Sequence, residues 1–331
     1  MEYVENVFPY SEFPQEKELK GEIIKLDTVL FRCPFRIRVE GDKAIVMDLH
    51  GIDYYAHLFK YPGFQYLSSF ERRGDSPTEM LSMDNVRFYN HKVWTLDANK
   101  RELTRLGFSS SGDSLLRDEA VTLDEDILRP PDFAIYNDTT FIIPDYSGEN
   151  RLCWLNDDGK LIKKIGTIPS INNQALRKVR PALAQAWRSF IDYNSHNGVL
   201  AMVTQLGEVL EVYNFKDSTE VIRIGENGEP KFKVFEGYGI PSGIMGFSDV
   251  QVTDNAIYAV FHGTTFKEIA RHNGSLPDGG KYIYVFSLKG EPLCKYVLDH
   301  YVYGIWVDEV TKTIIATDVN NDQPIVTFCF G

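Results

Sequence analysis

The chain has 331 residues, 43% of them hydrophobic, with 21 Phe and 18 Tyr. This composition excludes intrinsic disorder and favours strands, because aromatic and β-branched side chains suit a half-buried pleated surface. The formal net charge of −12 disfavours nucleic acid and anionic membranes as general partners, since both require a positive field.

The ends of the chain and its cysteines are compatible with more than one cellular location. No apolar run reaches about 18 residues, so no transmembrane segment is expected. Residues 1–5 are acidic and lack the basic and apolar blocks of a signal peptide. The chain is cytoplasmic if it is complete, and periplasmic or lipid-anchored if a leader has been removed. Its four cysteines occur singly, and Cys33 and Cys329 are either cross-linked or, as we favour, two inert thiols.

One short pattern recurs six times: an apolar run, an acidic or polar residue, a turn and a second apolar run. The first runs end at Asp48, Asp97, Asp145, Gln205, His262 and Asp318. These positions are 49, 48, 60, 57 and 56 residues apart, and a four-stranded propeller blade requires about 40–50 residues. The repeat therefore predicts an all-β fold, a six-bladed β-propeller with four-stranded antiparallel blades.

The last repeat stops after three strands, whereas the extended segment near residues 21–30 has no sheet of its own. We expect this segment to complete the last blade, which closes the ring and removes its open edges. A single propeller domain is expected over residues 1–331. Its blades are expected near residues 34–73, 84–127, 131–168, 188–226, 247–299 and 302–330, with a short helical insertion near 171–188.

Several segments resemble a known family. Residues 70–79, FERRGDSPTE, are similar to the Gly-x-Gly-Pro-x-Glu connection of bacterial TolB-like six-bladed propellers, with Ser76 in place of the second glycine. Residues 249–259, 284–292 and 305–318 resemble the last two blades of that family, and residues 145–152 resemble the Asp…Asn-Arg-Ile signature of NHL-type repeats. The resemblance implies a six-bladed propeller, often found in exported or lipid-anchored bacterial proteins. It implies no reaction, because that family is largely without an assigned activity.

The two faces of the predicted ring differ in loop length. The turns that join first to second and third to fourth strands are short, and we call their side the short-turn face. The remaining connections carry the insertions near residues 72–79, 166–188, 225–246 and 262–280. Because long loops are where function concentrates, this second side, the elaborated face, is the predicted location of the site.

Seven residues on these insertions are candidate ligand-binding residues: Arg177, Arg180, Trp187, Arg188, Tyr238, His262 and His272. An apolar stripe, interrupted by Pro181, predicts two short helices with a basic cluster beside them. The cluster either offers guanidiniums to an anionic ligand or belongs to a packed connector, which we favour. Tyr238 and its aromatic neighbours either contact a sugar or peptide or pack on the ring. The two histidines either bind a metal or have no ligand role, which we favour because no carboxylate partner is fixed by spacing.

The residues that end the second strands offer a competing hypothesis. Asp48, Asp97, Asp145 and Asp318 should encircle the mouth of the ring, where Ca²⁺ or another divalent cation would serve a hydrolase or lactonase. We favour a structural role, because Asp at a strand end commonly accepts backbone N–H bonds and shapes the turn. The chain also lacks GxSxG, HExxH, P-loop and Rossmann motifs. The first hypothesis is thus a non-enzymatic module without a cofactor that binds an unknown protein, peptide or glycan. The second is the metal-dependent hydrolase.

Overall fold

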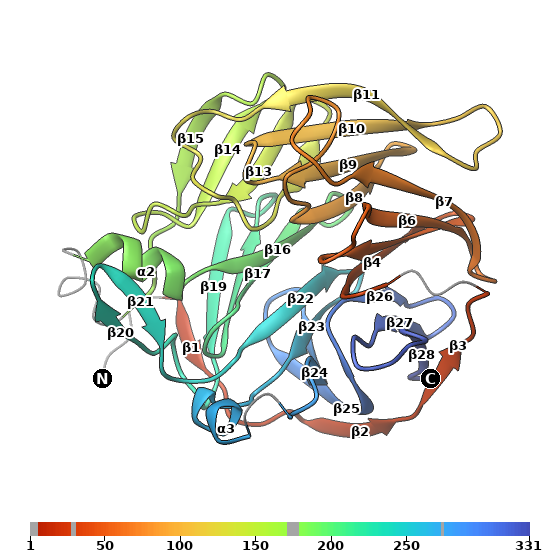
Figure 1. Cartoon of the computed structure of the whole chain (residues 1–331). Helices are drawn as coiled ribbons and strands as arrows, with labels where there is room; N and C mark the ends of the chain where they lie inside the picture. Colours follow the sequence, from red (N-terminus) through yellow and green to blue (C-terminus); the bar gives the residue numbers. More distant parts are fainter. Residues whose placement is uncertain (1–5, 28–30, 171–178, 273–274) are drawn as a thin grey trace.

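The computed structural model describes residues 6–27, 31–170, 179–272 and 275–331. It forms a ring of six antiparallel blades around a central axis (Figure 1). In every blade the first strand lies next to the axis, and the following strands are added outward in chain order. This arrangement confirms the six-bladed propeller predicted from the repeat.

The first three blades are built from consecutive strands. Blade one contains β4 (Pro34–Glu40), β5 (Lys43–Asp48), β6 (Tyr54–Lys60) and β7 (Gln65–Arg72). Blade two contains β8 (Asn85–Tyr89), β9 (Lys92–Asp97), β10 (Glu102–Phe108) and β11 (Leu115–Thr122). Blade three contains β12 (Ala134–Asn137), β13 (Thr140–Pro144), β14 (Leu152–Asn156) and β15 (Leu161–Ile165).

The last three blades receive strands from the N-terminal segment. Blade four contains β16 (Ser189–Asn194), β17 (Val199–Thr204), β18 (Val209–Asn214), β19 (Thr219–Ile224) and β1 (Val7–Pro9). Blade five contains β22 (Phe247–Val252), β23 (Ala256–Phe261), β24 (Gly280–Ser287), β25 (Pro292–Val302) and β2 (Gln15–Leu19). Blade six contains β26 (Ile305–Asp308), β27 (Thr313–Thr317), β28 (Ile325–Cys329) and β3 (Gly21–Ile24).

The ring closes as the unfinished last repeat predicts. Strand β3 pairs antiparallel with β28, with Gly21 opposite Phe328 and Ile24 opposite Ile325. The two ends of the chain thus share one sheet, and the outer edge of β28 is covered. Cys33 and Cys329 are both free thiols.

Two further N-terminal strands were not predicted. Strand β1 pairs parallel with β19, and β2 pairs parallel with β25, so blades four and five each gain a fifth strand. The segment follows the outside of the ring from blade four to blade six (Figure 1). In β2 only Leu19 is buried, and the other four residues are exposed. A short polar stretch of this kind has no strand signal, because only the edge of β25 makes it extended.

The core consists of six apolar layers, one between each pair of neighbouring blades. Blades one and two, for example, share a cluster that includes Ile45 and Val93. Blades six and one share another, which includes Ile315 and Val46. Since both faces of each sheet are buried, the second strands read as continuous apolar runs rather than as alternating ones.

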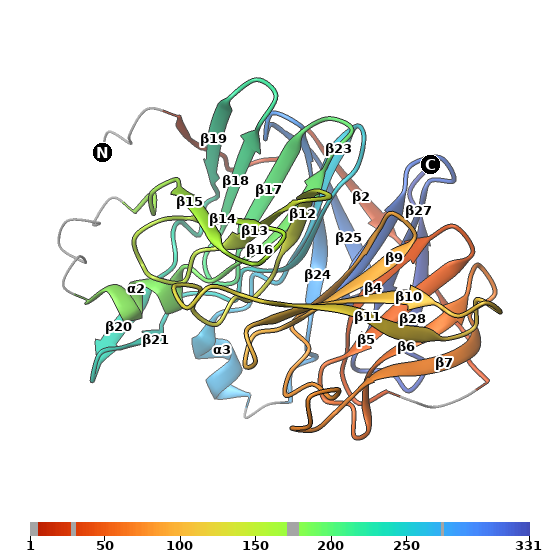
Figure 2. The ribbon, with the colours of Figure 1, turned by 90° about the horizontal axis from the view of Figure 1, so that it is seen from above.

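The insertions gather on one side of the ring (Figure 2), where α2 (Arg180–Ala186), α3 (Phe266–Arg271) and the hairpin of β20 (Phe232–Phe235) and β21 (Tyr238–Pro241) project. Helix α2 has Pro181 in its first turn, where a missing N–H is tolerated. Leu183 and Trp187 bury its apolar stripe against blade four and β1. Of the two predicted helices, the described residues contain α2 alone, and residues 171–178 lie outside the description.

Candidate functional site

The inner strands carry a buried network of alternating charge around the axis. Arg38 on β4 donates to both oxygens of Asp249 on β22, at 3.1 Å each. Arg87 on β8 pairs with Asp132 at 3.1 Å and also with Asp192 on β16. Arg36 lies 3.4 Å from Asp249. Three guanidiniums thus face three carboxylates within the ring.

The same carboxylates bind the free edges of neighbouring inner strands. Asp132 accepts the N–H of Ile191 at 2.9 Å, and Asp192 accepts the N–H of Val252 at 2.7 Å. Asp249 accepts the N–H of Ile305 at 3.0 Å. An inner strand has no neighbour on its axial side, so these bonds satisfy backbone donors that the fold would otherwise bury unpaired.

Asp249 is held in its charged form by the arginines around it. Burial opposes its charged form, but Arg36 and Arg38 outweigh that cost and lower its pKa below the ordinary value. The network is therefore a preformed, charged floor rather than a set of free reactive groups.

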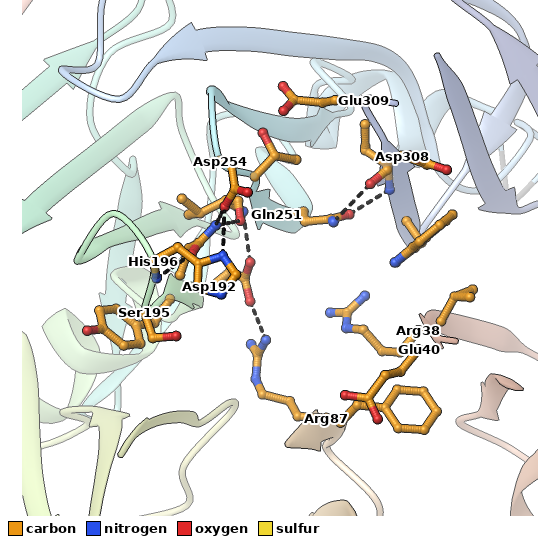
Figure 3. Close-up of a pocket in the computed structure, with 18 of the residues that line it drawn as sticks. Arg38, Glu40, Arg87, Asp192, Ser195, His196, Gln251, Asp254, Asp308 and Glu309 are labelled. Atoms are coloured by element: carbon orange, nitrogen blue, oxygen red, sulfur yellow. Dashed lines mark hydrogen bonds and ion pairs between the residues drawn. The ribbon is translucent and has the colours of Figure 1, made fainter. Parts of the chain in front are cut away.

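A cavity of about 730 Å³ opens above this floor. It is lined by the ends of all six inner strands and by hairpins that lead into the second strands, including residues 194–196, 253–255 and 308–310. The cavity therefore opens on the short-turn face, at the axis. Figure 3 shows charged side chains from several blades around its open centre, with Arg38 and Glu40 on one side and Asp192 and Asp254 on the other. We call this cavity the axial pocket.

Comparison with known proteins identifies the family to which this propeller belongs. A family model described as TolB-like 6-blade propeller-like matches residues 12–310. The chain belongs to this TolB-like family. The match spans blades one to five and reaches β26 of blade six, and it includes β2 and β3, the second and third strands of the N-terminal segment.

Solved structures with the same fold share little sequence with this TolB-like propeller. A “putative exported protein” from Bacteroides fragilis has a TM-score of 0.60 at 10% identity, with 97% of this chain and 98% of that chain covered. An auxiliary nutrient binding protein from Bacteroides ovatus has a TM-score of 0.59 at 11% identity, with 95% and 77% covered. Streptogramin B lyase has a TM-score of 0.53 at 12% identity, with 95% and 88% covered. These likenesses show the fold alone, and no curated protein matches the chain.

The structure describes six of the seven predicted ligand-binding residues of this TolB-like propeller. None of those that the structure describes lines the axial pocket, and Arg177 lies outside the description. Their positions differ: Arg180 is half-exposed and pairs with Glu149, Trp187 is 2% exposed, Arg188 is half-buried, Tyr238 is 60% exposed, His262 is buried beside Tyr303, and His272 is exposed at the end of α3. The burial of Trp187 against Arg151 is that of a packed connector.

The four strand-end aspartates accept hydrogen bonds from the protein itself. Some donors lie in the turn that follows, as Lys100 does for Asp97, Asn150 for Asp145 and Asn320 for Asp318. Others lie 15 to 19 residues away: Arg32 and Cys33 for Asp48, Leu81 for Asp97, Lys164 for Asp145 and His300 for Asp318. Across the described ranges, no group of three or more His, Cys, Asp or Glu residues is arranged to hold a metal. No helix in those ranges is long and apolar enough to cross a membrane.

Charged residues within the predicted inner strands indicate the axial pocket, whereas loop length indicates the opposite face. In the first inner strand, Arg36, Arg38 and Glu40 alternate with apolar residues. Charged residues also interrupt the inner strands of blades two, four and five, at Arg87 and at two aspartates. Charge within the innermost strand of a blade is costly unless the strands pair their charges across the axis. Recognising this would have identified the axis as a polar site.

Two buried histidines predict a pH-dependent stability. Burial lowers the pKa of His57 and of His262 from 6.5 to about 4. The unfolded chain binds these protons below about pH 6.5 and the folded chain does not, so stability falls as the pH drops from about 6.5 towards 4. At pH 5 the expected loss is about 2 kcal/mol for each histidine.

Urea unfolding at pH 7 and pH 5 checks this. In the variant His57→Gln the loss between the two pH values should shrink by about 2 kcal/mol relative to wild type. His272→Gln, at an exposed position, serves as the control and should keep the wild-type loss. An unchanged pH dependence in His57→Gln would show that His57 binds its proton in the folded state.

Proposed function

We propose that this TolB-like propeller is a non-enzymatic binding module that holds a small polar ligand, or a protruding side chain of a partner, in the axial pocket. The observation that carries the proposal is the pocket itself, about 730 Å³ in volume and lined by all six blades. Ligand sites in proteins have volumes of about 300–1,000 Å³ and combine apolar walls with a few placed polar groups. The proposal moves the site from the elaborated face to the short-turn face.

The walls of the axial pocket are suited to recognition. Phe88, Tyr89, Tyr193 and Trp306 line it and are each half-buried, so that part of each ring is open to a ligand. The charged floor ties neighbouring inner strands together. A pocket held in this way is preformed, which lowers the entropy that binding must offset.

The strand-end aspartates support binding over metal-dependent hydrolysis. A catalytic cation requires oxygen ligands that are free to coordinate it. Asp48 and Asp97 each accept at least two backbone N–H bonds, and Asp145 pairs with Lys164 at 3.1 Å. Withdrawing these oxygens would leave those N–H groups and the Lys164 ammonium without their acceptors.

Thermal unfolding with a library of defined sugars, amino acids, amines and nucleotides tests the proposal. A ligand at 100 times its Kd adds about 2.7 kcal/mol to the stability. We expect such a shift in wild type and in Tyr238→Ala, whose residue is exposed on the elaborated face, and its loss in Trp306→Ala. The proposal fails if Tyr238→Ala, rather than Trp306→Ala, removes the shift. It also fails if Ca²⁺, Mg²⁺, Mn²⁺ or Zn²⁺ alone raises the melting temperature.

A further inference from the structure

The charge of the axial pocket is unevenly distributed between floor and mouth. Its two guanidiniums belong to the floor, where Arg38 pairs with Asp249 and Arg87 pairs with Asp132 and Asp192. Each of these bonds consumes an N–H that a ligand would otherwise use. The floor is therefore neutralised by its own partners and offers little to an anion.

The mouth of the pocket is anionic. Four carboxylates line it, Glu40, Asp254, Asp308 and Glu309, against the single ammonium of Lys312. These side chains come from the hairpins of blades one, five and six, and Figure 3 shows the four carboxylates around the opening. The whole chain has the same sign, with a net charge of −12. A cleft lined by one sign of charge concentrates ligands of the other sign.

The side-chain partners of Glu309 and Asp308 are neutral, whereas Asp254 lies 3.2 Å from the imidazole of His196. Glu309 accepts from the Asn255 amide at 2.7 Å and from the Tyr258 hydroxyl at 3.2 Å. Asp308 accepts from the Thr311 hydroxyl at 2.7 Å. Neutral donors orient a carboxylate without cancelling its charge.

Glu40 is the carboxylate with the weakest partnership. The imidazole that lies 3.6 Å from it belongs to His91, whose side chain is 97% exposed. Burial raises the pKa of Glu40 above its ordinary value. A half-buried carboxylate of this kind is stabilised when a cation replaces the water that it has lost.

Aromatic rings complete the arrangement. The half-buried rings of Phe88, Tyr89, Tyr193 and Trp306 line the same pocket as the carboxylates. The face of an aromatic ring attracts ammonium and guanidinium groups, with a gain of about 0.5–2 kcal/mol that increases on desolvation. The anionic rim, the aromatic wall and the neutralised floor together favour a positively charged organic ligand.

We infer that the axial pocket binds an organic cation, an amine or guanidinium, either as a free small molecule or as a Lys or Arg side chain of a partner. This inference rests on the proposed binding function and specifies its ligand. The cation would lie at the anionic mouth, with its hydrocarbon part against the rings.

A matched four-carbon series tests the assignment by isothermal titration calorimetry. Putrescine, 1,4-butanediol and succinate have similar size and differ in charge. Putrescine should bind at least tenfold more tightly than the other two, and its affinity should fall as NaCl rises from 50 to 300 mM. Two capped peptides, Gly-Arg-Gly and Gly-Gln-Gly, distinguish the sources. Preference for the Arg peptide over putrescine indicates a partner side chain, and the reverse indicates a free amine.

Variants locate the binding. Glu40→Gln combined with Glu309→Gln should weaken binding of the cation at least tenfold, while Asp42→Asn should leave it unchanged. Asp42 lies in the same β4–β5 hairpin as Glu40, has a side chain 67% exposed, and does not line the pocket. Circular dichroism melting of each variant verifies folding.

The outcomes separate this inference from the proposed function. If succinate or butanediol binds as tightly as putrescine or more tightly, and Trp306→Ala abolishes that binding, the preference for a cation is wrong. The axial pocket would then still be the binding site. Unchanged affinity in the Glu40/Glu309 double variant would also overturn the preference for a cation. Binding of neither putrescine nor the Arg peptide at 10 mM would overturn the cation as well, and the library screen with Trp306→Ala would then decide the proposed function independently.

Discussion

Removal of residues 1–24 is expected to abolish cooperative unfolding of the ring. This deletion takes away β1, β2 and β3, which pair with blades four, five and six. Blade six would be left with three strands, and the outer edge of β28 would be open to other chains. It would also remove the bond from Gly21 N–H to Asp299 at 2.8 Å. We expect a melting temperature lower by more than about 10 °C, broad transitions and aggregation.

Differential scanning calorimetry checks this prediction, with a graded control. Removal of residues 1–13 deletes β1 and leaves β2 and β3 in place. Because the four strands of blade four remain paired with one another, this shorter deletion should lower the melting temperature only slightly. If the chain that starts at residue 25 melts as sharply and as high as wild type, the N-terminal strand does not hold the ring closed.

Substitution of Arg151 by Met is expected to destabilise the protein by about 3–5 kcal/mol. Arg151 and Glu211 lie between blades three and four with side-chain exposures of 2% and 0%, and their closest N–O distance is 2.6 Å. Arg151 also donates to the backbone oxygen of Trp187 at 3.1 Å and to the Ser189 hydroxyl at 2.8 Å. Without the guanidinium, the Glu211 carboxylate is buried with no cation beside it.

Two matched variants distinguish the effect of the buried charge on stability from the effect of lost packing. Arg151→Met combined with Glu211→Gln should recover part of the loss, because no uncompensated charge remains. Arg105→Met removes a surface arginine that pairs with Asp118 and Glu119, all at least one-third exposed, and should cost less than about 1 kcal/mol. Urea unfolding measures all three. A loss in Arg151→Met no larger than in Arg105→Met would contradict a structural role for the buried pair.

The repeat made the fold predictable because each blade carries its own copy of a short-range signal. An apolar run that ends in Asp recurs through most of the chain, and the structure places these runs in the second strands, buried between blades. Closure followed from counting strands, since the last repeat lacked one and the segment near Gly21 had no partner. Strands β1 and β2 were not predicted, because their extended form depends on the edges of strands more than 200 residues away in the sequence.

The candidate site depends on contacts between different blades. Loop length indicated the elaborated face, but there Trp187 is buried in a packed connector and Arg180 pairs with Glu149. The axial pocket instead arises where six inner strands end together, so its residues come from every blade. A single strand shows only that a charged residue such as Arg38 alternates with apolar ones.

By itself, the sequence determined the number of blades and the strand that closes the ring, because these depend on patterns within one repeat or at its ends. The tertiary structure decided which charges neutralise each other. Arg38 and Asp249 are 211 residues apart and meet only across the axis. This pairing neutralises the guanidiniums of the floor, so that the carboxylates Glu40, Asp254, Asp308 and Glu309 set the charge of the mouth.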